Sequence, residues 1–348
     1  MASRRRSAWQ ALNKPIRDSI GSAWRAGVPA EATALYGRWW QLETWLRSLA
    51  YVELRARDGA GWAAALPVIA EQREKKDRQH EYMMTSDAHS QLAYLDPSPL
   101  FQLGLTHWPL FAQTLIDENT WRGRVDELLR IRHRIGHCRR PHTDDLRRVE
   151  QTLRDLEPGA FRATSAFNRQ FEPSSKLADP VVDAWVRNAH LDAGRLVRHA
   201  EEQYDVQFVL RCSHRPWAAQ LKNDETITGK EGYLWHAAWY LLDGALDLRR
   251  FWGDGYLEQH RDLIVLLCAD TPMNVEVSFA AVDNPDTVAD AIGNCFDALI
   301  SSLQRGKIPE RVWDSWSELH AGLDPHVQVN TPWSIIDDIT VPVTIFGA

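Results

Sequence analysis

The sequence LLRIRHRIGHCRRPH occupies residues 128–142 of this chain. It places five arginines and three histidines in fifteen residues, although the 348-residue chain has a formal net charge of −7. Such a concentration of positive charge has three interpretations. It is a basic helix face in contact with solvent, a metal site built on His133 and His137, or a site that acts on a phosphate.

The basic stretch lies at the end of a predicted helix over residues 121–138, because Pro141 favours a stop just before it. His133 and His137 are four positions apart and therefore share one helix face. Zinc sites use this spacing, but they need a third ligand and usually a glutamate beside the first histidine, where this chain has Arg134. The neighbouring positive arginines disfavour a bound metal cation. The interpretation as a solvent-exposed helix face is not excluded, because arginines commonly occupy the solvent side of a helix.

A phosphate site needs a guanidinium that grips non-bridging oxygens and an imidazole that moves a proton near neutral pH. Arg132 and His137 supply these groups, but they lie five positions apart, about 140° around a helix. The arginine side chain therefore has to swing round to share a phosphate with the imidazole. RNA cleavage by the neighbouring 2′-hydroxyl needs two proton transfers and a stabilising cation, which two copies of the helix across a twofold axis would supply.

The residues before and after this stretch predict an all-helical N-terminal half. Residues 31–58 repeat apolar side chains at spacings of three and four, which predicts one long helix closed by Gly59. Further helices are expected over residues 61–82 and 144–157, the last ending before a Pro-Gly pair. Three prolines divide residues 94–111 into loops and short helices.

The pattern changes in the C-terminal half, where a helix over residues 181–204 is followed by segments rich in β-formers. Strands are expected in DVQFVLRCS, GYLWHAAWYLL, DLIVLLCA, NVEVSFAAV and ITVPVTIF, with a helix over residues 284–306. The fold class is therefore α+β. The predicted organisation is a helical bundle over residues 1–160, a linker over 161–180 and an accessory or sensor domain over 181–348.

The charge is divided unevenly between these parts. Residues 1–160 carry 24 Lys and Arg against 20 Asp and Glu, whereas residues 161–348 carry 16 against 27. The first part can attract a polyanion, and the second repels one. The four cysteines are widely spaced, which predicts a protein without a disulfide framework. No apolar run has the length of a signal peptide or of a membrane span, so we expect a soluble cytoplasmic protein.

The segment ELLRIRHRIGHCRR, together with the order of the helices on either side of it, resembles the HEPN superfamily of helical domains. The motif is an Arg, four to six residues, then a His, with a polar residue after the Arg and a small residue before the His. Arg132, His133, Gly136 and His137 match these positions in turn. Arg130 also fits the permitted spacing to His137, but the apolar Ile131 would then occupy the polar position, so Arg132 is the preferred motif arginine. Residues 30–157 resemble the HEPN domains associated with Swt-type RNA endonucleases.

The resemblance implies a metal-independent endoribonuclease that needs no cofactor and works as a homodimer with a composite active site. It would cleave its RNA substrate to a 2′,3′-cyclic phosphate, in a bacterial toxin or antiphage role, with an antitoxin or a phage-derived trigger as protein partner and no membrane. Catalysis is expected from Arg132, His137 and His133. RNA contacts are expected from Arg134, Arg139, Arg140 and His142, with Glu43 as a supporting residue that orients a motif arginine.

Two alternatives stay open at the level of sequence. A non-catalytic HEPN module would bind RNA or a nucleotide, or form dimers, beside a ligand- or protein-sensing C-terminal domain. The position after Arg132 is more often Asn or Asp in this superfamily, and His133 there serves either as a second proton carrier or as a spacer. In the C-terminal half, His214, Arg215 and His236 mark either a nucleotide or peptide pocket or a packed sheet face.

Overall fold

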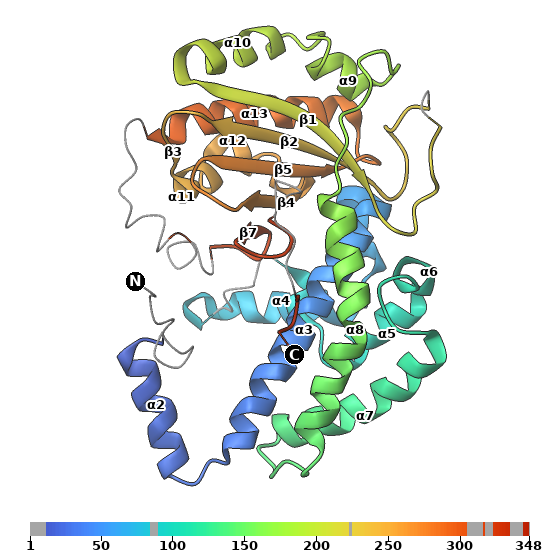
Figure 1. Cartoon of the computed structure of the whole chain (residues 1–348), viewed down its shortest axis with the longest axis vertical. Coiled ribbons are helices and arrows are strands. Elements are labelled where there is room, and N and C mark those ends of the chain that lie inside the picture. Colours follow the sequence, from blue (N-terminus) through green and yellow to red (C-terminus); the bar gives the residue numbers. More distant parts are fainter. Residues whose placement is uncertain are drawn as a thin grey trace, which may run out of the picture.

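The computed structural model describes residues 12–83, 90–222, 225–304, 316, 323–334 and 344–347. Figure 1 shows a group of helices below and a twisted sheet above, with further helices over the far face of the sheet. We refer to residues 12–168 as the helical half and to residues 169–347 as the sheet half. This arrangement confirms the predicted α+β class, with the helical part at the N-terminal side and a mixed sheet in the C-terminal side.

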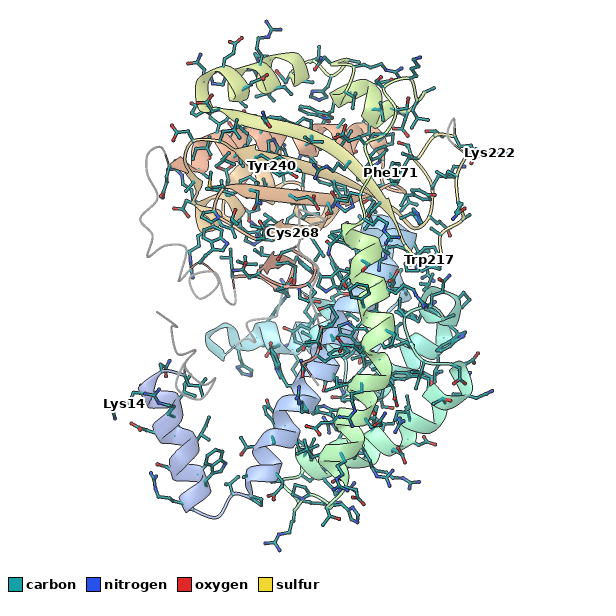
Figure 2. The ribbon with its side chains drawn as sticks, in the orientation of Figure 1. Lys14, Phe171, Trp217, Lys222, Tyr240 and Cys268 are labelled. Carbon is teal, nitrogen blue, oxygen red and sulfur yellow. The ribbon has the colours of Figure 1, made fainter. Side chains whose placement is uncertain are left out.

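The helical half contains helices joined by short connections. Their bounds are α2 Lys14–Arg25, α3 Ala30–Asp58, η1 Gly59–Ala65, α4 Val68–Asp77, η2 Arg78–Met83, η3 Gln91–Tyr94, α5 Pro97–Thr106, α6 Trp108–Phe111, α7 Glu118–Gly136 and α8 Asp145–Asn168. Helices α3 and α8 run side by side toward the sheet, whereas α2, which carries Lys14, stands apart from the others (Figures 1 and 2).

Helix α3 is the central helix of this half, as its apolar spacing predicted. Its buried side chains include Leu35, Leu42 and Leu49, which are fully covered. The helix ends at Gly59, whose φ of 59° lies in the left-handed region that favours glycine. A Cβ at Gly59 would lie 2.1 Å from Asp283 Oδ1, so glycine also permits the close approach of α3 to the turn after β5.

At two prolines, the helices of this half differ from the sequence prediction. The expected helix over residues 61–82 is instead divided into η1, α4 and η2, because Pro67 interrupts it. Helix α8 does not end before Pro158 but continues through it to Asn168. Gly159, the residue after this proline, lets α8 pack closely on another segment, since a Cβ there would lie 2.0 Å from the Thr114 carbonyl oxygen.

The sheet half forms a five-stranded sheet in the order β1-β2-β5-β4-β7, in which β4 and β7 pair in parallel and the other neighbours are antiparallel. The main strands are β1 Val206–His214, β2 Tyr233–Leu241, β4 Ile264–Ala269, β5 Asn274–Ala280 and β7 Val327–Val329. A small second sheet pairs β3 Ala245–Leu246 with β6 Leu303–Gln304. The expected strand ITVPVTIF, residues 339–346, falls largely outside the described residues.

Helices cover one face of this sheet. Their bounds are α9 Pro180–Trp185, α10 Ala193–Tyr204, α11 Leu248–Trp252, α12 Gly255–Glu258 and α13 Pro285–Ser302, with η4 at Arg261–Leu263. The helix expected over residues 181–204 is therefore two helices. The chain turns between them, where Asn188 has a φ of 58° that no right-handed helix can accommodate.

The two faces of the sheet belong to different apolar clusters. Strand β2 shows the alternation, since Trp235 and Trp239 pack with α9, α10 and α13, whereas Leu234 packs with the helical half. Between the halves, Phe171 exchanges two backbone hydrogen bonds with Cys212 of β1, at 2.9 and 2.8 Å. The predicted linker over residues 161–180 thus includes the end of α8 and an edge contact with the sheet. The domain boundaries stay a prediction.

Candidate functional site

The motif occupies the C-terminal end of α7. Asp117 begins this helix by accepting a hydrogen bond from Thr120 N–H at 3.1 Å. Hydrogen bonding to the Thr120 side chain and to this N–H lowers the pKa of the Asp117 carboxyl. The helix ends at Gly136, two residues before the predicted end, so His137 is its cap residue. Cys138 has a φ of 51°, and the following N–H of Arg139 donates to the Arg134 carbonyl at 2.8 Å. This is a Schellman turn in which cysteine holds the position usually taken by glycine.

Gly136 leaves room for the Arg132 guanidinium on the surface of α7. A Cβ at Gly136 would lie 3.0 Å from Arg132 Nη1 and 3.5 Å from its Cζ, which shows that the guanidinium lies directly over this glycine. The guanidinium therefore lies over the residue that directly precedes His137 in the chain. The small residue before the motif histidine has a physical reason, because a Cβ there would make a tight contact with the guanidinium, which would have to shift slightly.

The two motif histidines lie side by side. The rings of His133 and His137 are nearly parallel, with an interplanar angle of 10° and ring centroids 6.2 Å apart. Both side chains are exposed, whereas Arg132 is half-buried. The structure thus brings together all three residues expected to carry catalysis, one guanidinium and two imidazoles at one solvent-facing helix end.

Arg134 is held away from this group by a carboxylate. It forms a two-pronged ion pair with Asp145, at 2.7 Å for Nε to Oδ2, with a second, shorter contact from Nη2 to Oδ1. Asp145 is 1% exposed and also accepts a hydrogen bond from the His142 N–H. Burial alone would raise the pKa of Asp145, but the guanidinium and the N–H outweigh it and lower the pKa. Arg134 closes the turn between α7 and α8.

Arg139, Arg140 and the side chain of His142 are exposed in this same turn. His142 lies beside Asp144, with Nδ1 3.9 Å from its carboxylate. Arg130 and Arg147, which the sequence prediction did not include among the RNA contacts, are exposed on α7 and on the first turn of α8. The end of α7 and the start of α8 thus present several positive side chains around the histidine pair.

Glu43 does not contact the motif arginine. Its carboxylate accepts a hydrogen bond from Trp39 Nε1 at 2.6 Å and forms an ion pair with Arg47, one turn further along α3. The carboxylate nearest to Arg132 among the described ion pairs belongs instead to Asp96, with Oδ1 3.8 Å from Arg132 Nη2. Sequence reasoning missed Asp96, and its only signal was a place in the DPSP segment that starts α5.

Of the three candidate residues in the sheet half, Arg215 and His236 are buried and bonded within the fold. Arg215 is fully buried and forms a two-pronged ion pair with Glu53 of α3. His236 is fully buried between the hydroxyl groups of Ser213 and Ser278, at 2.7 and 2.8 Å. His214, in contrast, lines a cavity of about 630 Å³ together with Phe171 and Lys222, two residues that are labelled in Figure 2.

Within the ranges that the structure describes, no group of three or more His, Cys, Asp or Glu side chains is arranged to hold a metal ion. In the same part of the chain, no helix combines the length and apolar character that crossing a membrane requires.

Comparison with known families agrees with this geometry. Residues 40–157, from within α3 to within α8, match the family model described as Swt1-like HEPN. No curated protein and no solved structure gives a significant match to the chain. The helical half therefore contains an HEPN domain, a class whose members generally are ribonucleases that bind RNA and dimerise. More narrowly, this HEPN domain resembles that of Swt1.

Proposed function

We propose that this chain is a metal-independent endoribonuclease that cleaves RNA to a 2′,3′-cyclic phosphate. The observation that carries the proposal is the end of α7, where the Arg132 guanidinium lies over Gly136 beside the exposed rings of His133 and His137. A polyanion can approach this surface, and the group contains both a phosphate-binding cation and proton carriers.

The chemistry needs three functions. One imidazole takes the proton of the 2′-hydroxyl, whose oxygen attacks the adjacent phosphorus. The bond from phosphorus to the 5′-oxygen breaks, and a second imidazole gives that oxygen a proton, which leaves a 5′-hydroxyl and a cyclic phosphate. The Arg132 guanidinium donates to the non-bridging oxygens, whose negative charge increases in the crowded phosphorane. His137 is our first candidate for a proton carrier, and His133 is the second.

A homodimer would complete the site. The motif lies at a helix end on the surface of the protomer, so a second copy across a twofold axis would face it with an identical set of groups. In such a cleft the two copies of His137 would act on opposite sides of one phosphate. Arg139, Arg140 and His142 would then bind flanking phosphates, with Arg130 and Arg147 further along the same surface.

For the biological role, we infer a toxin or antiphage nuclease that a second protein controls. The sheet half carries most of the negative charge, so it disfavours RNA on its own surface and leaves the helical half to bind it. The sheet half would sense or restrain, and an antitoxin or a phage-derived trigger is the kind of partner that would act on it.

The test is cleavage of labelled RNA by the full chain in EDTA. Wild type is expected to cleave and to leave a 2′,3′-cyclic phosphate end, whereas Arg132→Ala and His137→Ala should lower the rate by about 10³-fold or more. Arg122→Ala is the matched control, since it removes the same charge from an exposed side chain at the far end of α7. Cleavage that survives both motif substitutions, or that needs an added metal, contradicts the proposal. Salt-sensitive binding without cleavage would favour the adaptor alternative.

A further inference from the structure

The carboxylate of Asp96 stands between two arginines from different helices. Its Oδ2 accepts a hydrogen bond from Arg73 of α4 at 2.6 Å, and its Oδ1 lies 3.8 Å from Nη2 of Arg132. Asp96 therefore joins the motif arginine to the opposite side of the helical half. The contact with Arg132 is long enough to leave the guanidinium N–H groups available to another acceptor.

The local sequence explains why this carboxylate is free to make such contacts. Asp96 is the N-cap residue of α5, where an aspartate normally accepts hydrogen bonds from the second and third backbone N–H groups of its helix. Here the third helical residue is Pro99, which has no N–H, so only the Ser98 N–H remains of these two partners. The side chain of Asp96 makes no capping hydrogen bond, and it turns to the arginines instead.

The backbone that carries Asp96 is held in place by two other arginines. Arg47 of α3 donates to the carbonyl oxygens of Leu92 and Leu95, at 3.0 and 3.2 Å. Arg73 donates to the Tyr94 carbonyl at 3.0 Å in addition to its contact with Asp96. The segment is therefore fixed from α3 on one side and from α4 on the other.

Tyr94 and Glu43 complete this support. The Tyr94 hydroxyl donates to Asp77 of α4 at 2.9 Å, and burial together with this hydrogen bond raises the pKa of Tyr94 to about 12. Glu43 forms an ion pair with Arg47, and Trp39 Nε1 donates a hydrogen bond to Glu43. The effect of Glu43 on the motif, which the sequence suggested as a direct pairing, would thus pass through Arg47 and the backbone before Asp96.

We propose that Asp96 is the positioning residue of the motif arginine, and that it sets the direction in which Arg132 presents its guanidinium to an RNA phosphate. This inference rests on the proposed function, since it concerns the same site. Arg132 is a half-buried side chain that covers Gly136 on one side, and Asp96 is the charge that meets it on the other. A guanidinium held from two sides loses less conformational freedom when it binds a phosphate.

A cap or a general surface charge would predict other behaviour. A cap residue would affect the stability of α5, but Asp96 makes no side-chain capping bond there. A surface charge would act only through the overall field, in the same way as any other exposed carboxylate. Asp96→Asn and the control Glu71→Gln separate these explanations, because Glu71 is an exposed acid on α4 that pairs with Lys75 instead of with the motif.

The experiment measures single-turnover RNA cleavage and the binding of a 2′-O-methyl RNA, which lacks the attacking hydroxyl. Asp96→Asn should lower the cleavage rate constant about 10-fold and weaken binding, with an unchanged melting temperature. Asp96→Glu should recover part of the loss because it retains the carboxylate. Arg73→Gln should have a smaller effect, about threefold, since the carboxylate stays but loses its anchor. Glu71→Gln should match wild type in both measurements.

Coupling to Arg132 decides the question. In an Arg132→Ala background, Asp96→Asn should change binding of the 2′-O-methyl RNA by less than about twofold, because the group that it positions is gone. Equal losses in both backgrounds, or no loss in either, would overturn the positioning role. If wild type binds RNA but does not cleave it, the proposed nuclease function fails, and the binding cycle still tests the coupling of Asp96 to Arg132.

Discussion

The boundary between the two halves and the end of α7 use the same residue types in opposite ways. At the boundary, Glu53 and Arg215 are both fully buried, and the guanidinium meets the carboxylate at 3.0 and 2.6 Å. At the end of α7, Arg132 has a carboxylate at 3.8 Å and His137 is exposed. Position in the fold, more than residue type, decides which charges hold the structure and which can bind a ligand.

The buried pair is surrounded by further hydrogen bonds that leave Glu53 well satisfied. Trp217 Nε1 donates to its Oε2 at 2.7 Å, and Arg215 also donates to the carbonyl of Ala163 on α8 at 3.1 Å. Figure 2 shows Trp217 beside the upper ends of the long helices, where the halves meet. These contacts join α3, α8 and the segment after β1, so they hold the two halves against each other.

The largest expected effect comes from breaking the buried pair. Arg215→Ala leaves the Glu53 carboxylate buried without its cation, which should lower the free energy of unfolding by about 3–5 kcal/mol. Urea denaturation measures this loss as a lower midpoint. Arg195→Ala is the matched control, since its ion pair with Asp192 is exposed, and its midpoint should equal that of wild type. A midpoint for Arg215→Ala that equals the control would mean that the buried pair does not hold the halves together.

A smaller effect is expected for Arg134, which lies next to the motif but behaves like the boundary pair. Arg134→Ala leaves the buried Asp145 with only its backbone donor, and the free energy of unfolding should fall by about 1–2 kcal/mol at pH 7. The folded-state pKa of Asp145 is lowered, so its stabilising contribution is present above the ordinary carboxyl pKa and is lost as the pH falls through the folded value.

The difference between wild type and Arg134→Ala should therefore be largest near pH 7 and should shrink as the pH falls from the ordinary carboxyl pKa through the lowered folded-state pKa of Asp145. Urea unfolding at a series of pH values measures it. Arg139→Ala removes an exposed charge from the same turn and should leave the unfolding curve unchanged at every pH. A loss that does not change with pH would show that Arg134 acts by packing, without its contact to Asp145.

The sequence allowed prediction of the parts of this structure that depend on local pattern. Apolar spacing predicted α3, and the content of β-forming residues predicted the strands β1, β2, β4 and β5 and with them the α+β class. The HEPN motif follows from residue order. The continuation of α8 through Pro158 was not predictable in this way. In the structure Gly159 packs closely on Thr114, a residue that lies far away along the chain, and such contacts cannot be read from a local pattern.

The same limit applies to the site. Arg132, His133 and His137 lie within six residues, so local geometry alone brings them together. Asp96 lies near Arg132 because α5 packs against α7. Glu43 pairs with Arg47, one turn away on α3, and not with a motif arginine. Arg134 was expected to bind RNA, but a distant carboxylate from α8 holds it. RNA binding by Arg134 remains a prediction, in which a phosphate would have to compete with Asp145 for the guanidinium.

The smallest expected change in stability tests the motif side of the comparison. Gly136→Ala replaces a helical glycine at an exposed position, which should raise the free energy of unfolding by about 0.5–1 kcal/mol. The new Cβ would lie 3.0 Å from Arg132 Nη1, so the guanidinium has to move. Cleavage should therefore fall by about 3- to 10-fold while stability increases.

Gly123→Ala is the matched control, because Gly123 is an exposed glycine in the same helix and a Cβ there meets no other atom within 4 Å. It should gain similar stability and keep full activity. Urea unfolding and single-turnover cleavage on both variants give the comparison. Equal activity in the two variants would show that Arg132 does not need its place over Gly136. A loss confined to Gly136→Ala would show that this end of α7 gives up stability to hold the arginine where a phosphate can meet it.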